Sequence, residues 1–238
     1  MAGNRTAAGR ASFSERIEAI AWTRTYDVLV RVPFIAWFLF LEFATITHLA
    51  SYIDARGAVP DALFFTNVLA RVAVILFLAT WVAFVMLRSA PKRKTPGLWP
   101  RFAAFLGSFV MMALPLFPAH ELSLGTSILS TMLIFAGDGF AVYVVFWLGR
   151  SVSLMPEARK LVTRGPYAVI RHPLYAAEEA AVVGTFLQFA SPWTTLILVV
   201  HALIQIQRMG YEEQVLHQSF PEYGDYASRT ARLIPGLY

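Results

Sequence analysis

Between two long apolar blocks, the chain carries the polar segment Leu161-Val-Thr-Arg-Gly-Pro-Tyr-Ala-Val-Ile-Arg-His-Pro-Leu-Tyr175. A second polar block follows it and includes Tyr211-Glu-Glu-Gln214, Phe220-Pro-Glu-Tyr-Gly-Asp-Tyr226 and Arg232-Leu-Ile-Pro-Gly236. The apolar region 174–208 between them is interrupted at Ser191-Pro192. Because proline removes a backbone donor and disfavours helix in the residue before it, we predict a helical hairpin here. The hairpin would bring the two polar blocks together at one membrane face.

The composition is typical of a membrane protein. Of the 238 residues, 57% are hydrophobic and only 15% are charged, with a mean hydropathy of +0.56. A soluble domain averages about 45–50% apolar and about 25% charged residues. We therefore predict an all-α, polytopic integral membrane protein with about five to six transmembrane helices. The net charge of +5 then marks the cytoplasmic face rather than a nucleic-acid partner.

The sequence excludes cysteine chemistry. With no cysteine in the chain, disulfides, thiolate metal sites and cysteine nucleophiles are all ruled out. The histidines show no metal-ligand spacing, so we expect no metal site.

The predicted spans follow from runs of about 20 apolar residues. Four stretches qualify, at 28–49, 62–87, 98–117 and 122–148. They divide the chain into a cytoplasmic N-terminal segment (1–27), the four spans (28–148) and a C-terminal cofactor-binding region (149–238) that contains the hairpin 174–208. Lysine and arginine concentrate before the first span, after the second and after the fourth. This alternation predicts that both termini and both polar blocks lie on the cytoplasmic side.

The hairpin also predicts which polar residues meet. With the turn near Ser191, Arg171 and His172 are expected to lie near Tyr211 and Glu212, within about one helical turn, or roughly 5 Å.

The local chemistry of the first polar segment suits an anionic group. Gly165-Pro166 predicts a turn, and His172-Pro173 predicts a helix start whose free N–H groups favour a carboxylate or phosphate. The guanidinium of Arg171 can grip a carboxylate with two hydrogen bonds. A structural alternative stays open, because arginine and tyrosine are common anchors at membrane boundaries and paired glutamates often form a solvated helix end.

These motifs, with the closing Leu233-Ile-Pro235, resemble the isoprenylcysteine carboxyl methyltransferase family and related membrane phospholipid methyltransferases. The resemblance covers about 150–236, with the parts in the family's order and spacing. One difference is Ala176-Ala177, where the family often has Leu-Gly or Ala-Gly. The resemblance implies S-adenosylmethionine as the cofactor, bound at the cytoplasmic side. The residues that it implies for cofactor binding are Leu161, Val162, Gly165, Pro166, Tyr167, Arg171, His172, Pro173, Tyr175, Glu178, Glu212 and Glu213.

The resemblance also implies a reaction, which is methyl transfer to a lipidic or amphipathic acceptor, most simply a carboxylate as in prenylcysteine carboxyl methylation. A carboxylate is already a nucleophile, so the enzyme mainly has to align the reactants and exclude water. We expect Arg171 and Glu213 to be the catalytic residues, with Arg171 orienting the acceptor or cofactor carboxylate. An amine or hydroxyl acceptor would need a base instead.

Asp138, in Ala136-Gly-Asp-Gly-Phe140, is predicted to lie about 15 Å below the cytoplasmic end of its helix. Ionisable residues at this depth usually face a cavity or a partner. We expect Asp138 and Arg71 to contribute to the substrate site, and the alternative is a buried ion pair of Asp138 with Arg31 or Arg71.

Two other functions remain possible from the sequence. Some membrane reductases that use a nicotinamide cofactor resemble this C-terminal region, although their chains are usually longer. A non-catalytic membrane transport protein would explain the intramembrane charges but not the Arg-His-Pro and Glu-Glu motifs. Binding of S-adenosylhomocysteine separates the methyltransferase from both. The expected partner is a membrane lipid or a lipidated or amphipathic substrate.

Overall fold

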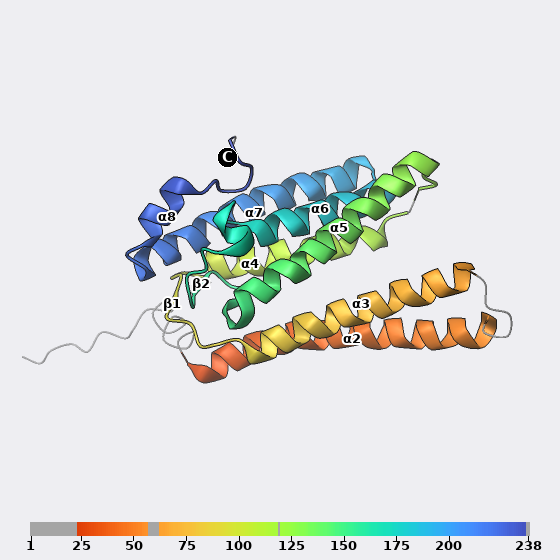
Figure 1. The fold of residues 1–238 in the computed structure, drawn as a ribbon, viewed down its shortest axis with the longest axis horizontal. Helices are drawn as coiled ribbons and strands as arrows, with labels where there is room; N and C mark the ends of the chain where they lie inside the picture. Colours follow the sequence, from red (N-terminus) through yellow and green to blue (C-terminus); the bar gives the residue numbers. More distant parts are fainter. Residues whose placement is uncertain (1–22, 57–61, 119, 237–238) are drawn as a thin grey trace, which may run out of the picture.

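The computed structural model describes residues 23–56, 62–118 and 120–236, so nearly all of the predicted segment 1–27 lies outside it. The described residues are mostly helical, as predicted (Figure 1). In chain order the elements are α2 (Arg24–Arg56), α3 (Ala62–Leu87), β1 (Arg93–Lys94), α4 (Trp99–Phe109), η1 (Val110–Leu116), α5 (Leu124–Leu148), η2 (Gly149–Ser151), β2 (Glu157–Ala158), η3 (Gly165–Ala168), α6 (Pro173–Gln188), α7 (Pro192–Ser219) and α8 (Tyr223–Arg229).

The helices form two groups that meet mainly at one end of the molecule. α2 and α3 pack along each other as a hairpin, while α4 to α7 form a bundle in which α5 packs on α6 and α4 packs on α7 (Figure 1). At the shared end, β1 pairs antiparallel with β2, with Arg93 opposite Ala158. This two-residue ribbon was not predicted from the sequence.

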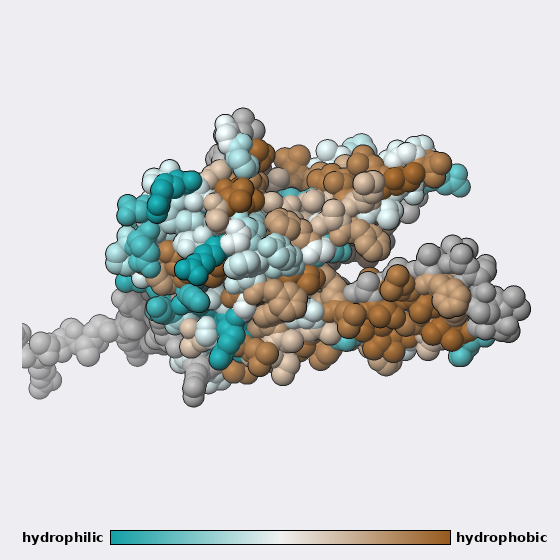
Figure 2. Space-filling model, viewed as in Figure 1, coloured by the Kyte–Doolittle hydropathy of each residue, from teal (hydrophilic) through white to brown (hydrophobic). Residues whose placement is uncertain are grey.

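The surface suits a lipid environment. The segments Thr25–Ala55 and Leu124–Ser151 are long and apolar enough to cross a membrane. Large apolar side chains point outward from these helices, such as Phe43 with 65% of its surface exposed and Phe146 with 64%. Hydrophilic side chains gather at the end of the molecule that carries β1, β2 and α8 (Figure 2). An apolar surface of this extent supports membrane association.

The predicted hairpin is confirmed in outline. α6 ends at Gln188 and α7 begins at Pro192, after a capping box in which the side chains of Ser191 and Thr194 each accept the other's backbone N–H. The predicted span 98–117 is one continuous stretch that folds as α4 followed by the 3-10 helix η1. Pro115 within η1 lacks the N–H that would continue an α-helix, which favours the tighter 3-10 turn.

α5 and α6 approach each other backbone to backbone. A Cβ atom added to Gly137 would lie 2.6 Å from the carbonyl oxygen of Ala177 and 2.6 Å from the nitrogen of Ala181. Farther along, the hydroxyl of Ser130 donates to the carbonyl of Gly184 at 2.7 Å. Glycine at 137 therefore lets α6 lie directly on α5, which fixes the direction in which α6 presents its first turn.

A small core at the polar end anchors the C-terminal region. Its buried members come from β2, α7, α8 and the turn before α8, and they are Ala158, Val215, Phe220, Tyr223 and Tyr226. This core holds α8 against the end of α7, so the chain after α8 runs back beside the start of α6.

Candidate active site

The Arg-His-Pro corner and the Glu-Glu motif meet as the hairpin predicted. Nε of Arg171 donates to Oε1 of Glu213 at 3.0 Å, and Nε2 of His172 lies 3.0 Å from the same oxygen. Arg232, from the C-terminal segment, also donates its Nε to this oxygen, at 3.1 Å. One carboxylate oxygen of Glu213 thus joins three segments that lie far apart in the sequence.

Arg171 holds the C-terminal segment as well. Its Nη1 donates to the carbonyl oxygens of Ala227 at 2.7 Å and Thr230 at 2.6 Å. The backbone N–H of Arg171 donates to Ala231, and that of His172 donates to Arg232. Nε and Nη1 are therefore occupied by protein acceptors, while Nη2 has no acceptor among the described residues.

The three donors keep Glu213 ionised. Burial by itself raises the pKa of the Glu213 carboxyl. The hydrogen bond and charge of His172, the charge of Arg232 and the hydrogen bond of Arg171 outweigh burial and lower this pKa to about 2. The carboxylate is thus a fixed negative centre that organises the cations around it.

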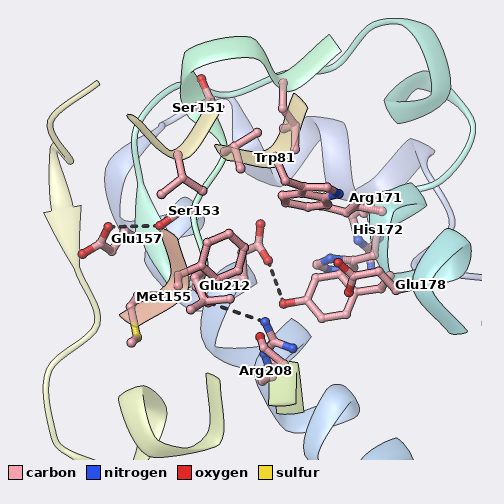
Figure 3. Close-up of a pocket in the computed structure, with 18 of the residues that line it drawn as sticks. Trp81, Ser151, Ser153, Met155, Glu157, Arg171, His172, Glu178, Arg208 and Glu212 are labelled. Carbon is pink, nitrogen blue, oxygen red and sulfur yellow. Dashed lines mark hydrogen bonds between the residues drawn. The ribbon is translucent and has the colours of Figure 1, made fainter. Parts of the chain in front are cut away.

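The neighbouring residues Glu212 and Glu213 differ in whether they line a pocket. Glu212 lines a polar pocket beside the corner, and its Oε2 accepts a hydrogen bond from the hydroxyl of Tyr175 at 3.2 Å. Glu213 does not line this pocket. The guanidinium of Arg208 lies over the ring of Tyr175, 5.2 Å from its centroid. Figure 3 shows Glu212, His172, Glu178 and Arg208 around the same space.

The polar pocket has two adjoining parts that share Tyr167, Arg171, His172 and Glu212. Eight of the predicted cofactor residues line one part or both, and they are Leu161, Val162, Tyr167, Arg171, His172, Tyr175, Glu178 and Glu212. Four predicted residues do not line it, namely Gly165, Pro166, Pro173 and Glu213. Ala177, where the sequence differs from the family, is buried and also lies outside the pocket lining.

The predicted residues outside the lining shape the pocket wall. Gly165 begins η3 with φ of +62°, and a Cβ there would lie 2.4 Å from Cε2 of Trp147. Only glycine combines this backbone conformation with room for the indole. Pro173 begins α6, as predicted, with His172 as the N-cap residue. Behind the wall, burial raises the pKa of Tyr226 to about 12, so its hydroxyl stays protonated and donates to the carbonyl of Tyr167 at 2.7 Å.

Several pocket residues were missed by the sequence analysis. Arg159 and Tyr223 line the pocket, and the Nε and Nη1 atoms of Arg159 and the hydroxyl of Tyr223 are buried without a hydrogen-bond partner among the described residues. The sequence did hold a signal for Arg208, because a cation at the end of the apolar run 174–208 is a candidate site residue. Trp81 comes from α3, and nothing in the sequence indicated that this helix would reach the site.

An ion-pair cluster ties α2 to the pocket wall. Asp27 in α2 pairs with Arg31, with Arg88 at 2.8 Å and with Arg159 at 3.6 Å. Arg159 in turn pairs with Glu157 at 2.6 Å. This cluster fixes the end of the α2–α3 hairpin next to β2.

The two predicted substrate residues lie in different surroundings. Asp138 in α5 faces an apolar cavity and has no hydrogen-bond or salt-bridge partner among the described residues. The ion pair with Arg31 that was an alternative is therefore wrong, because Arg31 pairs with Asp27 instead. Arg71 lies with its guanidinium over the ring of Tyr52, 4.6 Å from the centroid, and does not line the cavities that Asp138 faces.

Comparison with known proteins places these motifs in a family context. Residues 124–223 match the family model described as phospholipid methyltransferase. The protein-S-isoprenylcysteine O-methyltransferase B of Arabidopsis thaliana is 32% identical over 110 residues, which is 43% of this chain and 56% of that protein.

Two bacterial relatives match over shorter stretches. The nickel-cobalt-cadmium resistance protein NccN of Alcaligenes xylosoxydans xylosoxydans is 37% identical over 82 residues, 34% of this chain and 38% of that protein. The cobalt-zinc-cadmium resistance protein CzcN of Cupriavidus metallidurans is 36% identical over 78 residues, 32% of this chain and 36% of that protein. This chain thus spans well under two thirds of the length of each relative.

The family-model match covers α5 to the start of α8, which supplies most of the polar pocket together with Arg171, His172 and Glu213, while Arg232 lies beyond it. They favour a membrane methyltransferase, and they do not favour a nicotinamide reductase or a transport protein. In this region the chain resembles the isoprenylcysteine carboxyl methyltransferase family and the related membrane phospholipid methyltransferases, as the sequence motifs predicted.

Proposed function

We propose that this protein is an S-adenosylmethionine-dependent methyltransferase of the membrane, with the polar pocket as its cofactor site. The observation that carries the proposal is the convergence of Arg171, His172, Glu213 and Arg232 beside a pocket lined by Glu212 and Tyr167. The cofactor supplies a methyl group already activated on a sulfonium. The protein therefore has to bind, orient and exclude water rather than create an electrophile.

The donor set of the pocket fits this cofactor. Glu212 offers carboxylate oxygens to ribose hydroxyls or to an amino group. Arg159 and Tyr223 offer buried N–H and O–H groups that lack a partner among the described residues, and these suit a carboxylate or hydroxyl of the cofactor. Leaving such groups unpaired costs about 1–3 kcal/mol each, more when charged, which a polar ligand would recover.

Arg171 and Glu213 act in this proposal by positioning. Arg171 donates hydrogen bonds to Glu213 and to the backbone carbonyls of Ala227 and Thr230. These hydrogen bonds hold the C-terminal segment beside the pocket. Nη2 of Arg171 is left to orient a bound carboxylate, which is the role expected from the sequence. His172 stabilises Glu213 and presents its ring to the pocket.

The same proposal includes a multi-pass arrangement with the polar end in the cytoplasm. The basic residues of the loops after α3 and after α5 lie at this end, which agrees with the positive-inside rule. The soluble cofactor would enter from the cytoplasm, and an amphipathic acceptor would enter from the membrane.

The test is a calorimetric titration of the detergent-solubilised protein with S-adenosylhomocysteine. We expect micromolar binding that weakens about tenfold or more in Glu212→Gln, because the hydrogen bonds to a charged carboxylate are lost. Glu222→Gln, the same change at an exposed site outside the polar pocket, should bind like the unaltered protein. Absence of binding by protein that still unfolds cooperatively would overturn the proposed function.

A further inference from the structure

A second cavity, here called the inner cavity, lies next to the polar pocket. It has a volume of about 240 Å³, and α2 to α7 and η1 all contribute to its wall. Most of the wall is apolar, and Phe34, Trp81, Ser108, Leu154 and Glu178 line both spaces. Glu178 is therefore the one carboxylate among the described residues that borders both the proposed cofactor site and the inner cavity.

The ionisable groups that line the inner cavity are two carboxylates and one histidine. Asp138 and Glu178 line it, and neither has a hydrogen-bond or salt-bridge partner among the described residues. His201, only 2% exposed, also lines it, and its Nε2 lies 2.8 Å from a carboxylate oxygen of Glu179. In the neutral tautomer that donates Nε2–H to Glu179, Nδ1 keeps a lone pair. Nδ1 is buried without a partner among the described residues.

No lysine or arginine side chain lines the inner cavity in the described part of the chain. Arg208 lines the polar pocket instead, where it donates to Gln205 at 2.5 Å and to the carbonyl of Leu154 at 3.5 Å. The uncharged polar residues of the wall are Ser108, whose hydroxyl donates to Ala104, and Gln205. A carboxylate or phosphate in this cavity would meet two carboxylates of like charge, while the charge of Arg208 acts on Glu178 from the side of the polar pocket.

Aromatic rings complete the wall. Trp81 has ring centroids of Phe34 and Phe38 at 6.3 Å and of Phe77 at 6.4 Å, and all four residues line the cavity. Aromatic faces beside carboxylates attract ammonium groups, including methylated ones, through the negative face of each ring. The wall thus suits a nitrogen cation both before and after it gains a methyl group.

A groove between α3 and α5 leads to this cavity. It has a volume of about 500 Å³, is mostly apolar, and shares Phe77 and Asp138 with the inner cavity. The groove can hold an alkyl chain, while Asp138 marks the entrance to the inner cavity and Glu178 marks its border with the polar pocket.

Resting on the proposed function, we propose that the methyl acceptor is the amine of a lipophilic molecule that carries no carboxylate or phosphate next to the nitrogen. The tail of this molecule lies in the α3–α5 groove. The carboxylate of Asp138 attracts the ammonium group at the entrance to the inner cavity, and the carboxylate of Glu178 binds it at the border with the polar pocket. The acceptor class therefore differs from the carboxylate that the family resemblance suggested.

The transfer step balances with the groups present. The bound ammonium gives one proton to the carboxylate of Glu178, which frees the nitrogen lone pair. The nitrogen then forms a bond to the methyl carbon while the carbon–sulfur bond of the methylsulfonium donor breaks, and that electron pair stays on sulfur. The product is a methylammonium ion, and Glu178 returns its proton to water.

The experiment compares dodecylamine, dodecanoate and phosphatidylethanolamine, with the full chain in a neutral detergent. Binding is measured as a shift in melting temperature without cofactor, and methyl transfer is measured by mass spectrometry of the products. We expect dodecylamine to bind and to be N-methylated. Asp138→Asn should weaken its binding about tenfold or more and leave S-adenosylhomocysteine binding unchanged. The control Asp225→Asn changes an exposed aspartate in α8 and should alter neither.

The outcomes separate the two proposals. If S-adenosylhomocysteine binds but dodecanoate or phosphatidylethanolamine is methylated in preference to dodecylamine, the amine assignment is overturned and the methyltransferase stands. Binding of S-adenosylhomocysteine with none of the three compounds bound or methylated also overturns the assignment. If S-adenosylhomocysteine does not bind, the proposed function fails. Should Asp138→Asn not fold, Glu178→Gln takes its place, with dodecylamine binding and methyl transfer both expected to fall.

Discussion

Arg171→Ala is expected to lower methyl transfer by about 100-fold or more, which corresponds to roughly 2.7 kcal/mol of lost stabilisation. The change removes the hydrogen bonds of the side chain to Glu213, Ala227 and Thr230. The C-terminal segment then loses its attachment beside the polar pocket, and Nη2 no longer orients a bound carboxylate. The measurement is the initial rate of methyl transfer, together with the dissociation constant of S-adenosylhomocysteine.

Two further measurements identify the cause of this loss. Limited proteolysis should cut the segment 227–236 sooner in Arg171→Ala, while the helices keep their circular dichroism signal. The control Arg229→Ala removes an exposed arginine of α8 whose side chain, among the described residues, donates only to the carbonyl of Asp225 in the same helix, and it should behave like the unaltered protein. Near-normal turnover in Arg171→Ala would contradict the assigned role.

Gly137→Ala is expected to destabilise the protein more than the same change at Gly125 or Gly139, the other two glycines of α5. The new Cβ would lie 2.6 Å from two backbone atoms of α6, and backbone cannot move aside as a flexible side chain can. Overpacking of this kind costs about 1–3 kcal/mol or more. The apparent melting temperature in detergent should therefore fall, and the displaced α6 should weaken S-adenosylhomocysteine binding.

The same helix supplies the control for this prediction. Gly139 lies two residues farther on, and a Cβ there would have no atom within 4 Å. Gly139→Ala should leave the melting temperature unchanged or raise it, since alanine favours a helix over glycine by about 0.5–1 kcal/mol. Equal melting temperatures for the two variants would show that α6 does not rest on the backbone of α5.

Local signals made the helix starts and the hairpin predictable. Pro173 and Pro192 each occupy the first position of a helix, where the missing N–H costs nothing. The expected pairing of Arg171 and His172 with Tyr211 and Glu212 differs from the observed partner, Glu213, by only one or two residues. Counting residues outward from the hairpin turn predicts which residues of the two helices face each other only to within one turn of helix.

Other parts of the site depend on contacts that no local pattern encodes. Two partners of Asp27, Arg88 and Arg159, directly follow α3 and β2 and lie far from it in the sequence, and β1 and β2 are too short to produce an alternating pattern. Adjacent helical residues point about 100° apart, so only one of Glu212 and Glu213 could line the pocket, but the choice required the position of α6. The lack of a hydrogen-bond partner for buried atoms of Arg159 depends on the tertiary packing of the pocket wall, which the sequence does not reveal.

The sequence also indicated a cavity near Asp138, but not which other ionisable residues line it. The depth of Asp138 in an apolar helix predicted a cavity or an ion pair, and the structure gives the cavity. Glu178 and Asp138 were separate observations in the sequence, and the packing of α5, α6 and α7 places them on one wall with His201. The positive charge proposed for the acceptor follows from these residues lying together, and no single sequence motif contains all of them.

The most direct test of this account is a crystal structure of the protein with bound S-adenosylhomocysteine. The account predicts the nucleoside in the polar pocket between Tyr167, His172 and Glu212, with its sulfur beside Glu178 where the pocket borders the inner cavity. Binding at another place, such as the open hollow lined by Thr163, Glu222 and Arg229, would contradict it, because no carboxylate there borders the inner cavity.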